Sequence, residues 1–435
     1  TEIIPVCNKI GVTRLSDITD MDRLYVPNYS AVLPGTDDLF WVYSGKGVTK
    51  LHAKAGALME AIERYSSFPS SCNRDYVQGT YLHLSKIYNK VLHPGEVVEP
   101  VSDKFSDKES IADFLVGFDL LNNEEVLVPA EIALYRYLPR DPASSIFSIS
   151  HTNGLASGNV LEEAVCHALC EVIERDAISI ADLCASCIPF NILDKIWDSL
   201  KYGYPEARIT AEDTFVDDSS IFPEIDISEI VEEFSEIKQL VRRFIDTGVS
   251  LVIKDITQKE IGIPTFVAGT VEWISHDYGY FAKGFGTHPD SRIALVRAIT
   301  EASQTRVVNI HGARDDLKKI YYKENDEIYK RKWQFMPATS PSLKYNNGKF
   351  DKNNNITKFC EIQSFANNDI LDDIKLITSG LKNAGIKRVI IVDLTSPDIN
   401  IPVVRAIVPG LETFEVSRSL MGRRAKDHFK KTLKV

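Results

Sequence analysis

The chain has 435 residues, of which 44% are hydrophobic and 26% are charged, and its formal net charge is −11. This composition predicts a globular protein with a sizeable core, and the acidic balance argues against broad nucleic-acid binding, which needs a basic face. No apolar run approaches the roughly 18 residues that span a bilayer, and the N-terminal segment lacks the apolar core of a secretory signal. We therefore expect a cytoplasmic protein without membrane contact, and the odd number of seven scattered cysteines fits a reducing compartment.

In chain order, residues 1–40 are predicted to form a lead-in element, 41–415 one large domain and 416–435 a basic C-terminal tail. Within the domain, one pattern occurs three times. In each copy a turn of small residues precedes a predicted helix, in which two alanines lie seven and three residues before a glutamate. The three copies are Gly45-Lys46-Gly47 with Ala53, Ala57 and Glu60; Ala156-Ser157-Gly158 with Ala164, Ala168 and Glu171; and Gly284-Phe285-Gly286 with Ala294, Ala298 and Glu301.

A second element also recurs. Residues 255–264 and 393–402 share Asp-x-Thr followed by Ile-x-Ile-Pro at the same spacing, and 118–129 is a looser copy. Runs of β-branched residues around a polar turn, with proline opening the second strand, predict β-hairpins. We expect consecutive hairpins to join into antiparallel sheets backed by helices. The fold class is therefore α+β, with repeat units at about 41–150, 151–275 and 276–412 and quasi-threefold internal symmetry around one site.

The repeated helices carry acids at a spacing that places them on one face. Residues three apart on a helix share a face, as in Glu60 with Glu63 and Glu171 with Glu174, whereas the third copy pairs Glu301 with Gln304. If the helices converge, the acids repel one another unless cations lie among them, and an all-oxygen set suits Mg²⁺. Nearby arginines are shaped to bind phosphate oxygens, and they are Arg64, Arg175, Arg297 and Arg306.

Each such motif alone has an ordinary structural explanation, since a single Glu-x-x-Glu-Arg is most often a solvated helix face. Three registered copies favour a shared polar site for a metal and a nucleotide. His151 and His167 flank the second copy and are interpreted first as structural, with a role as a base as the alternative. The Cys184–Cys187 pair lies in an apolar helical context, which favours a core position over a sulfur-handling role, and no zinc site is expected. Walker, Rossmann, HExxH and GxSxG motifs are absent.

The repeated segments resemble the YcaO family. The matching phrases are GVTRLSDITDMDRLYVP, GKGVTKLHAKAGALMEAIERYSS, NGLASGNVLEEAVCHALCEVIERDA, KGFGTHPDSRIALVRAITEASQTR and PVVRAIVPGLET, which run from Gly11 to Thr413. The resemblance implies a YcaO-type fold and an enzyme that uses ATP and Mg²⁺ to activate the amide of a peptide bond.

The same resemblance implies roles for individual residues. The implied metal ligands are Glu60, Glu63, Glu163, Glu171 and Glu174. The implied catalytic residues are Glu171, Glu174 and Arg175. The implied nucleotide-binding residues are Thr13, Arg14, Lys46, Glu60, Arg64, Ser157, Glu163, His167, Arg297, Glu301, Gln304 and Arg306.

The end of the sequence bears on the expected reaction. Azoline-forming members of the family end in a proline-rich tail, and no proline follows Pro409 here. This favours the thioamide-forming branch, similar to methanogen proteins that modify a glycine in the α subunit of methyl-coenzyme M reductase. Expected partners are that protein substrate, a sulfide source and a TfuA-like protein, and a homodimer stays open. The alternatives are an azoline-forming cyclodehydratase, another amide-activating YcaO enzyme, or a nucleotide-binding adaptor without chemistry.

Overall fold

The computed structural model describes most of the predicted domain. The described residues are 3–38, 41–71, 73–97, 106–139, 145, 150–185, 222–226, 234–271, 282–311, 345–346, 349–350, 355–413, 422–425 and 427. Cys187 and most of the predicted tail at 416–435 lie outside them. Among the described helices, none is long and apolar enough to cross a membrane.

The N-terminal part folds as a three-stranded antiparallel sheet with order β1-β2-β3. Helix α2 packs on this sheet, and its first turn is capped by Thr49, whose side chain accepts a hydrogen bond from the His52 amide. The elements are α1 (Ile3–Ile10), β1 (Arg14–Asp17), η1 (Thr19–Met21), β2 (Asn28–Val32), β3 (Val42–Lys46), α2 (Lys50–Ser67) and η2 (Pro69–Ser71).

A six-stranded sheet has the order β4-β5-β15-β16-β7, with β6 paired to β5. Helix α5 contacts β7 and β16, and α11 packs against α5. The strands are β4 (Val77–Thr80), β5 (Ile111–Asp119), β6 (Glu124–Pro129), β7 (Leu155–Ser157), β15 (Ile390–Asp393) and β16 (Val403–Ile407). The helices are α3 (Tyr81–Ile87), η3 (Pro94–Glu96), α4 (Ala130–Ala133), α5 (Leu161–Ala185) and α11 (Ile370–Asn383).

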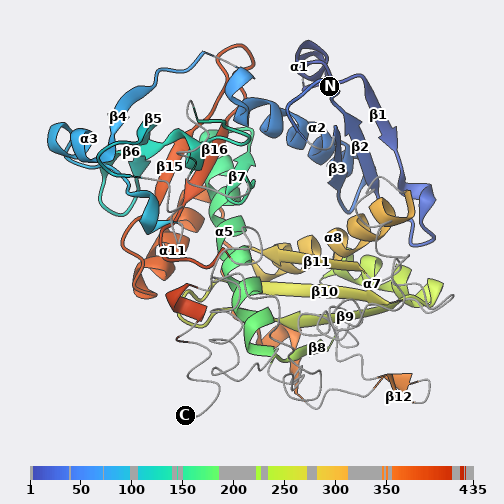
Figure 1. Ribbon diagram of the computed structural model, residues 1–435. Coiled ribbons are helices and arrows are strands. Elements are labelled where there is room, and N and C mark those ends of the chain that lie inside the picture. Colours follow the sequence, from blue (N-terminus) through green and yellow to red (C-terminus); the bar gives the residue numbers. More distant parts are fainter. Residues whose placement is uncertain are drawn as a thin grey trace, which may run out of the picture.

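A five-stranded sheet has the order β11-β10-β9-β8-β14 and is covered by α8 and α7. Figure 1 shows α5 between this sheet and the six-stranded sheet, with α2 and α8 to its side. The elements are β8 (Glu224–Asp226), α7 (Ser235–Thr247), β9 (Ser250–Asp255), β10 (Thr265–Val271), β11 (Ala282–Thr287), α8 (Ser291–His311), β14 (Ile356–Lys358) and η9 (Phe359–Glu361). A small separate pair of strands is β12 (Tyr345–Asn346) with β13 (Lys349–Phe350).

Three buried apolar clusters hold these layers together, and one of them joins the three-stranded sheet to the six-stranded sheet. Ile62 of α2 packs with Val128 of β6, Leu169 of α5 packs with Leu381 of α11, and Leu295 of α8 lies among the side chains of β9, β10 and α7. The three repeated helices are therefore each anchored by an apolar face, as the spacing of their apolar residues requires. Their remaining faces are free to carry the polar residues described below.

The three predicted hairpins are present as β5–β6, β9–β10 and β15–β16, all antiparallel. The expectation that consecutive hairpins join was wrong. The first and third share one sheet through β15, which pairs with β5 at Phe118 and Asp119, while the second lies in the other sheet. Alternation of residues along a strand predicts which face is buried but not which distant strand completes its edge.

Small residues explain how closely each repeated helix approaches its strand. A Cβ atom on Gly45 would lie 2.0 Å from the Ala53 oxygen and 2.1 Å from the Ala57 nitrogen. On Gly286 it would lie 2.0 Å from the Ala294 oxygen. Since real Cβ atoms do not approach backbone so closely, the glycines let strand and helix backbones touch.

This packing corrects the register of the third copy. Gly286, not Gly284, lies against α8 as Gly45 lies against α2, because both glycines precede the first packed alanine by eight residues. Ala156 has the same spacing before Ala164 in the second copy and is fully buried. His288 therefore stands where the other two copies have Gly47 and Gly158.

Candidate active site

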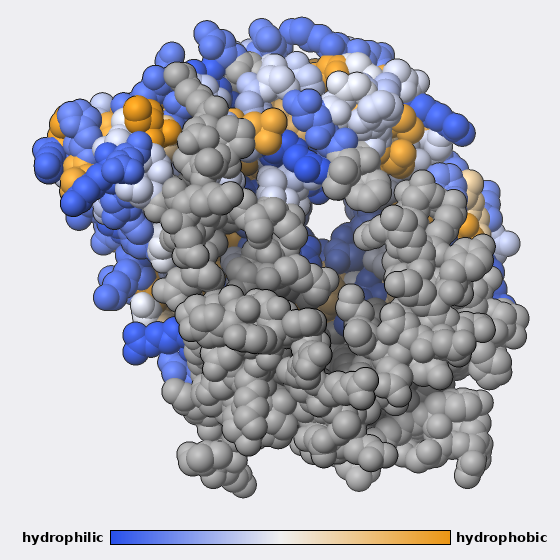
Figure 2. Space-filling model, in the orientation of Figure 1, coloured by the Kyte–Doolittle hydropathy of each residue, from blue (hydrophilic) through white to orange (hydrophobic). Residues whose placement is uncertain are grey.

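The polar faces of α2, α5 and α8 meet at one cavity of about 1140 Å³. Its lining includes thirteen of the sixteen residues to which the resemblance assigned a metal, catalytic or nucleotide-binding role. They are Lys46, Glu60, Glu63, Arg64, Ser157, Glu163, His167, Glu171, Glu174, Arg175, Arg297, Glu301 and Gln304. The face drawn in Figure 2 is hollowed between the positions of α2 and α8, and hydrophilic side chains are visible there.

Strand β3 of the first copy is tied to the helix of the third copy. The Lys46 ammonium forms an ion pair with Glu301, and Gln304 Nε2 donates a hydrogen bond of 2.6 Å to the Ser44 carbonyl oxygen. The Ser44 amide in turn donates to Glu60 Oε2 at 3.1 Å. Residues about 255 positions apart in the chain thus share one wall of the cavity.

Glu163 lies at the start of α5 and closes the first turn of that helix. Its Oε2 accepts hydrogen bonds of 2.8 Å from the Asn159 amide and from Asn159 Nδ2. Acids are favoured at a helix N-terminus because the helix dipole is positive there. Glu163 therefore has a local structural partner in addition to its place in the cavity lining.

Three carboxyl groups in the lining have raised pKa values, and of these Glu174 is 3% exposed whereas Glu63 and Glu171 are partly buried. Burial raises the pKa of Glu63 well above its ordinary value, and the charges of Glu171 and Glu60 add to this against the opposing effect of Arg64. Burial likewise raises the pKa of Glu171, against Arg175, and raises that of Glu174 to about 7. Close carboxylates in low dielectric cannot all ionise without compensating positive charge.

The pKa of Glu301, an acid of the same lining, shifts in the opposite direction. Burial alone would raise its pKa, but Lys46 and Arg175 outweigh that effect and lower it. His167 also lines the cavity, and its pKa is lowered well below the usual range by burial and by Arg297. The ring is therefore neutral near pH 7 and can offer a hydrogen bond without adding charge.

The lining fits a divalent cation together with a phosphorylated ligand. Glu63, Glu171 and Glu174 are oxygen donors whose raised pKa values would be relieved by a nearby cation, and all-oxygen donor sets suit Mg²⁺. Positively charged groups suited to phosphate oxygens share the same cavity. They are Lys46, Arg64, Arg175 and Arg297.

Three predicted nucleotide contacts lie outside this lining. Thr13 is exposed, with Oγ1 donating to the Val32 carbonyl, and Arg14 is an exposed residue of β1. The Arg306 side chain is 2% exposed, and its Nε donates a hydrogen bond of 2.8 Å to Asp22 Oδ2. Arg306 follows Gln304 by two residues, a spacing that turns a side chain to a different face of the helix. The sequence predicts Arg306 as a nucleotide contact because it lies close to the other candidate residues along the chain, whereas the structure places its side chain outside the cavity lining.

Arg405 was missed as a residue of interest, although it lies in the quoted phrase PVVRAIVPGLET. It is a buried residue of β16, and burial lowers its pKa to about 10 while the charge of Glu171 opposes the effect. A charged residue in a strand otherwise made of buried apolar side chains was the available signal.

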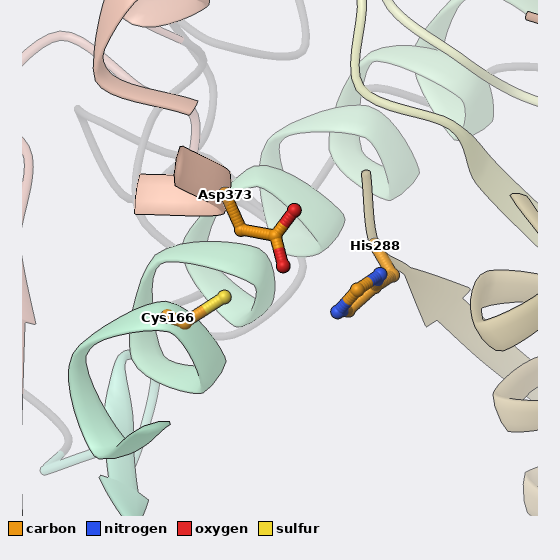
Figure 3. A group of neighbouring side chains, drawn as sticks. All are labelled: Cys166, His288 and Asp373. Atoms are coloured by element: carbon orange, nitrogen blue, oxygen red, sulfur yellow. The ribbon is translucent and has the colours of Figure 1, made fainter. Parts of the chain in front are cut away.

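A second group of side chains lies beside the cavity. Cys166 of α5, His288 after β11 and Asp373 of α11 point toward one another, with ligand atoms within 4.8 Å (Figure 3). The Asp290 amide donates to His288 Nδ1 at 3.0 Å, and burial together with Arg297 lowers the pKa of His288 to about 4. In a neutral ring whose Nδ1 accepts, Nε2 carries the proton and cannot bind a metal. We therefore assign the group no metal.

Comparison with known proteins identifies the fold and the family. The family model described as YcaO cyclodehydratase, ATP- and Mg²⁺-binding, matches residues 44–412. The chain belongs to the YcaO family. ATP and Mg²⁺, the cofactors predicted from the sequence, are those of this family, and ATP-dependent amide activation is its type of reaction.

Two relatives match over most of their length. An uncharacterized protein of Methanothermobacter thermautotrophicus is 32% identical over 423 residues, covering 96% of this chain and 94% of that protein. A protein of Rhizobium leguminosarum bv. trifolii, described as an uncharacterized protein in the tfuA 3' region, is 28% identical over 415 residues, 94% of this chain and 86% of that protein.

Solved structures share the mixed helix-and-sheet fold. YcaO from Methanopyrus kandleri bound with AMPPCP and Mg²⁺ gives a TM-score of 0.67 at 20% identity, covering 96% of this chain and 91% of that one. A heterocyclase in complex with substrate and cofactor gives the same TM-score at 22% identity. The match covers 95% of this chain but only 52% of the heterocyclase, so the chain spans about half of that longer protein.

Proposed function

We propose that this YcaO protein is an ATP- and Mg²⁺-dependent peptide thioamidase that replaces the backbone carbonyl oxygen of a glycine with sulfur. The observation that carries the ATP-dependent part is the cavity in which the carboxyl groups of three helices and four basic side chains meet. For the substrate, we propose the α subunit of methyl-coenzyme M reductase. A methanogen relative that aligns along nearly its whole length supports this choice.

In this proposal the cavity residues divide into two groups. Glu63, Glu171 and Glu174 hold Mg²⁺, with Glu60 and Glu163 at the edge of the same set. Lys46, Arg64, Arg175 and Arg297 bind phosphate oxygens. Mg²⁺ supplies neutralisation of phosphate charge, while the protein residues orient the phosphate chain and exclude water from it.

The proposed reaction joins three reactants. A hydrosulfide ion attacks the carbonyl carbon of the amide, forming the carbon–sulfur bond, and the resulting oxyanion takes the terminal phosphoryl group of ATP, which leaves ADP. The carbon–oxygen bond then breaks, phosphate departs, and loss of the sulfur-bound proton gives the thioamide. Phosphorylation converts a poor oxygen leaving group into a good one, so the enzyme contributes chiefly by positioning and charge stabilisation.

We also propose that the three strand–helix units are related by approximate threefold symmetry and build one nucleotide site together. A TfuA-like protein is the proposed partner, supported by the Rhizobium relative whose description places it beside tfuA. The division into 1–40, 41–415 and 416–435 stays a prediction from the sequence.

The second candidate is azoline formation, which the family description as a cyclodehydratase favours. In that reaction a Cys, Ser or Thr side chain of the peptide attacks, and water is lost overall. Mass spectrometry separates the two. Glycine-containing peptides from methyl-coenzyme M reductase, incubated with the enzyme, ATP, Mg²⁺ and sulfide, should gain the mass difference between sulfur and oxygen. Loss of one water from a Cys-, Ser- or Thr-containing peptide would support the second candidate instead.

A matched pair of variants controls the experiment. Glu174→Gln changes a cavity residue, whereas Glu162→Gln changes an acid of the same helix that does not line the cavity. The first should abolish product and the second should retain it. ATP-independent product in the wild type would contradict the proposed function.

A further inference from the structure

Arg64, one of the four basic residues of the cavity lining, lies within electrostatic reach of several acids. Burial alone would lower its pKa, but the charges of Glu60, Glu63 and Asp38 outweigh burial and raise it. Among the described residues its ion pair is with Glu60, at 3.4 Å, and not with Asp38. Because an acid that pairs tightly with Arg64 would compete with phosphate for the guanidinium, the partners of Asp38 bear on nucleotide binding.

Both carboxylate oxygens of Asp38 accept hydrogen bonds from tyrosines. The Tyr135 hydroxyl donates to Oδ1 at 3.0 Å, and the Tyr43 hydroxyl donates to Oδ2 at 3.2 Å. Burial raises the pKa of both phenols, and the charge of Asp38 adds to this, so each hydroxyl keeps its proton near pH 7. Hydrogen bonds to a carboxylate are charge-assisted. The two hydroxyls therefore stabilise the Asp38 anion without an ion pair to Arg64.

The ring of Tyr135 also contacts Arg64 directly. Its centroid lies 5.6 Å from Arg64 Cζ, which is within the range of a cation–π contact. Tyr135 is anchored to the end of α2, the helix that carries Arg64, because its amide donates to the Ser67 carbonyl oxygen at 3.0 Å and its ring lies 5.8 Å from that of Phe68. An aromatic face holds a guanidinium without neutralising its charge, so Arg64 stays able to bind an anion.

The two tyrosines and the acid stand behind the cavity. Arg64 lines it, whereas Asp38, Tyr43 and Tyr135 do not. These three residues can therefore affect a bound nucleotide only through a residue of the lining, and Arg64 is the phosphate-binding candidate that they reach. Asp38 is half-buried, and a carboxylate in such a place that loses two hydrogen bonds needs another partner. The guanidinium of Arg64 is within its electrostatic reach.

We propose that Tyr43 and Tyr135 are positioning residues for nucleotide binding, because their hydroxyls hold Asp38 and so leave Arg64 available to phosphate. This inference rests on the phosphate contact of Arg64 in the proposed function. It assigns the role to the two hydroxyl oxygens in addition to the ring contact. Without the hydroxyls, Asp38 draws Arg64 away from the cavity.

A rescue experiment tests the competition between Asp38 and phosphate. Calorimetry of the full chain with Mg²⁺ and a non-hydrolysable ATP analogue measures the affinity without turnover. Tyr43→Phe combined with Tyr135→Phe keeps both rings and should weaken the affinity roughly tenfold, the usual effect of losing a charged hydrogen bond. Adding Asp38→Asn removes the competing charge and should return the affinity to near the wild-type value. Unchanged affinity in the tyrosine variant, or no recovery with Asp38→Asn, would overturn the proposal.

Two controls separate positioning from general destabilisation. Tyr137→Phe removes another hydroxyl that donates to a carboxylate, that of Asp113, and neither residue lines the cavity, so the affinity should not change. In an Arg64→Gln background the two tyrosine substitutions should have no further effect, because they act through Arg64. A further loss in that background, or an equal loss in Tyr137→Phe, would refute the positioning role. Thermal denaturation confirms that each variant is folded at the temperature of the measurement.

The outcomes keep this inference apart from the proposed function. If the wild type forms no thioamide, the proposed function fails, while the rescue by Asp38→Asn still decides what the two tyrosines do. If thioamide forms and Arg64→Gln weakens nucleotide binding but the tyrosine variant does not, the proposed function stands and the inference is wrong.

Discussion

Glu171 and Glu174 lie one helical turn apart on α5 and face the same cavity, both with pKa values raised by burial. Carboxyl groups whose pKa values are raised in this way are typical of functional sites. Glutamine has nearly the same shape as glutamic acid but cannot carry the charge that binds a cation. Its introduction therefore tests the metal role with little disturbance of packing.

We predict that Glu171→Gln and Glu174→Gln each lower turnover by about a hundredfold or more, since a metal site loses a charged ligand. The midpoint of thermal unfolding without Mg²⁺ should stay the same or rise, because a buried repulsive charge is removed. Turnover assays and thermal denaturation of the same preparations check both parts. Full activity in either variant would remove that residue from the proposed site.

The pH dependence of stability gives a second prediction. The pKa of Glu174 rises from its ordinary value of 4.5 to about 7 in the folded protein. As pH increases between these values, the unfolded chain releases its proton first, so the folded state is progressively penalised by up to roughly 3 kcal/mol. Without Mg²⁺, the free energy of unfolding should therefore fall from about pH 4.5 to about pH 7.

Urea denaturation across this pH range, with EDTA or with Mg²⁺, measures the effect. Mg²⁺ binds the ionised carboxylates of the folded state and should restore stability at the upper end of the range. Glu174→Gln should flatten the EDTA curve. A wild-type curve in EDTA that rises over the same interval would contradict the burial of this carboxyl group.

For Arg306 we predict an effect on stability and little effect on nucleotide binding. Its ion pair with Asp22 is almost fully buried and joins α8 to the segment that follows η1. Breaking such a pair leaves a buried charge alone and costs about 3–5 kcal/mol. Arg306→Ala should lower the free energy of unfolding by that amount, while any change in nucleotide affinity, measured under fully folded conditions, should be small.

At the scale of elements, the strand–helix contact is the feature most sensitive to a single methyl group. Gly45→Ala should strongly destabilise the protein, because the new Cβ would lie 2.0 Å from the Ala53 oxygen. Gly56→Ala lies on α2 across the same interface, yet its Cβ would meet nothing closer than 3.4 Å. Alanine also favours a helix over glycine by up to about 1 kcal/mol. Thermal denaturation should show a large loss for the first and none for the second.

The repeated helices and hairpins were predictable because their signals are local. Alanines at fixed spacing and paired glutamates repeat within some twenty residues, and turn residues delimit each hairpin. The register of the third copy was not predictable from the sequence. Gly284 and Gly286 both pack closely against α8, and by pattern alone either could correspond to Gly45. Only the contacts between strand and helix backbones show that Gly286 is the one that corresponds to Gly45.

Long-range partners were also beyond the sequence. The pairing of β5 with β15, the Lys46–Glu301 ion pair and the burial of Arg306 beside Asp22 all join segments more than 200 residues apart. Composition and spacing name residues with the right chemistry but do not say which of them face each other. That is why the helix acids were assigned to the cavity by their face, whereas Arg306, chosen only for its charge, was misplaced.

At the scale of the whole molecule, the described residues present one large polar cavity to which all three repeated helices contribute. Glu60 comes from α2, Glu171 from α5 and Glu301 from α8. The copies are not equivalent, since Glu301 is engaged by Lys46 and is followed by Gln304 where the other copies have a second acid. Three independent sites would each need a full set of acids, whereas one composite site does not.

We therefore predict that calorimetry with Mg²⁺ and a non-hydrolysable ATP analogue gives about one nucleotide per chain. Glu60→Gln and Glu171→Gln should each weaken that single binding event, although the two residues lie on different helices. Glu301→Gln should weaken it less directly, by freeing Lys46 and disturbing the wall that joins β3 to α8. Two or three binding events per chain would refute the composite site. So would variants on α2 and α5 that each abolish a different event, because a shared charge cluster requires every member to act on the same bound nucleotide.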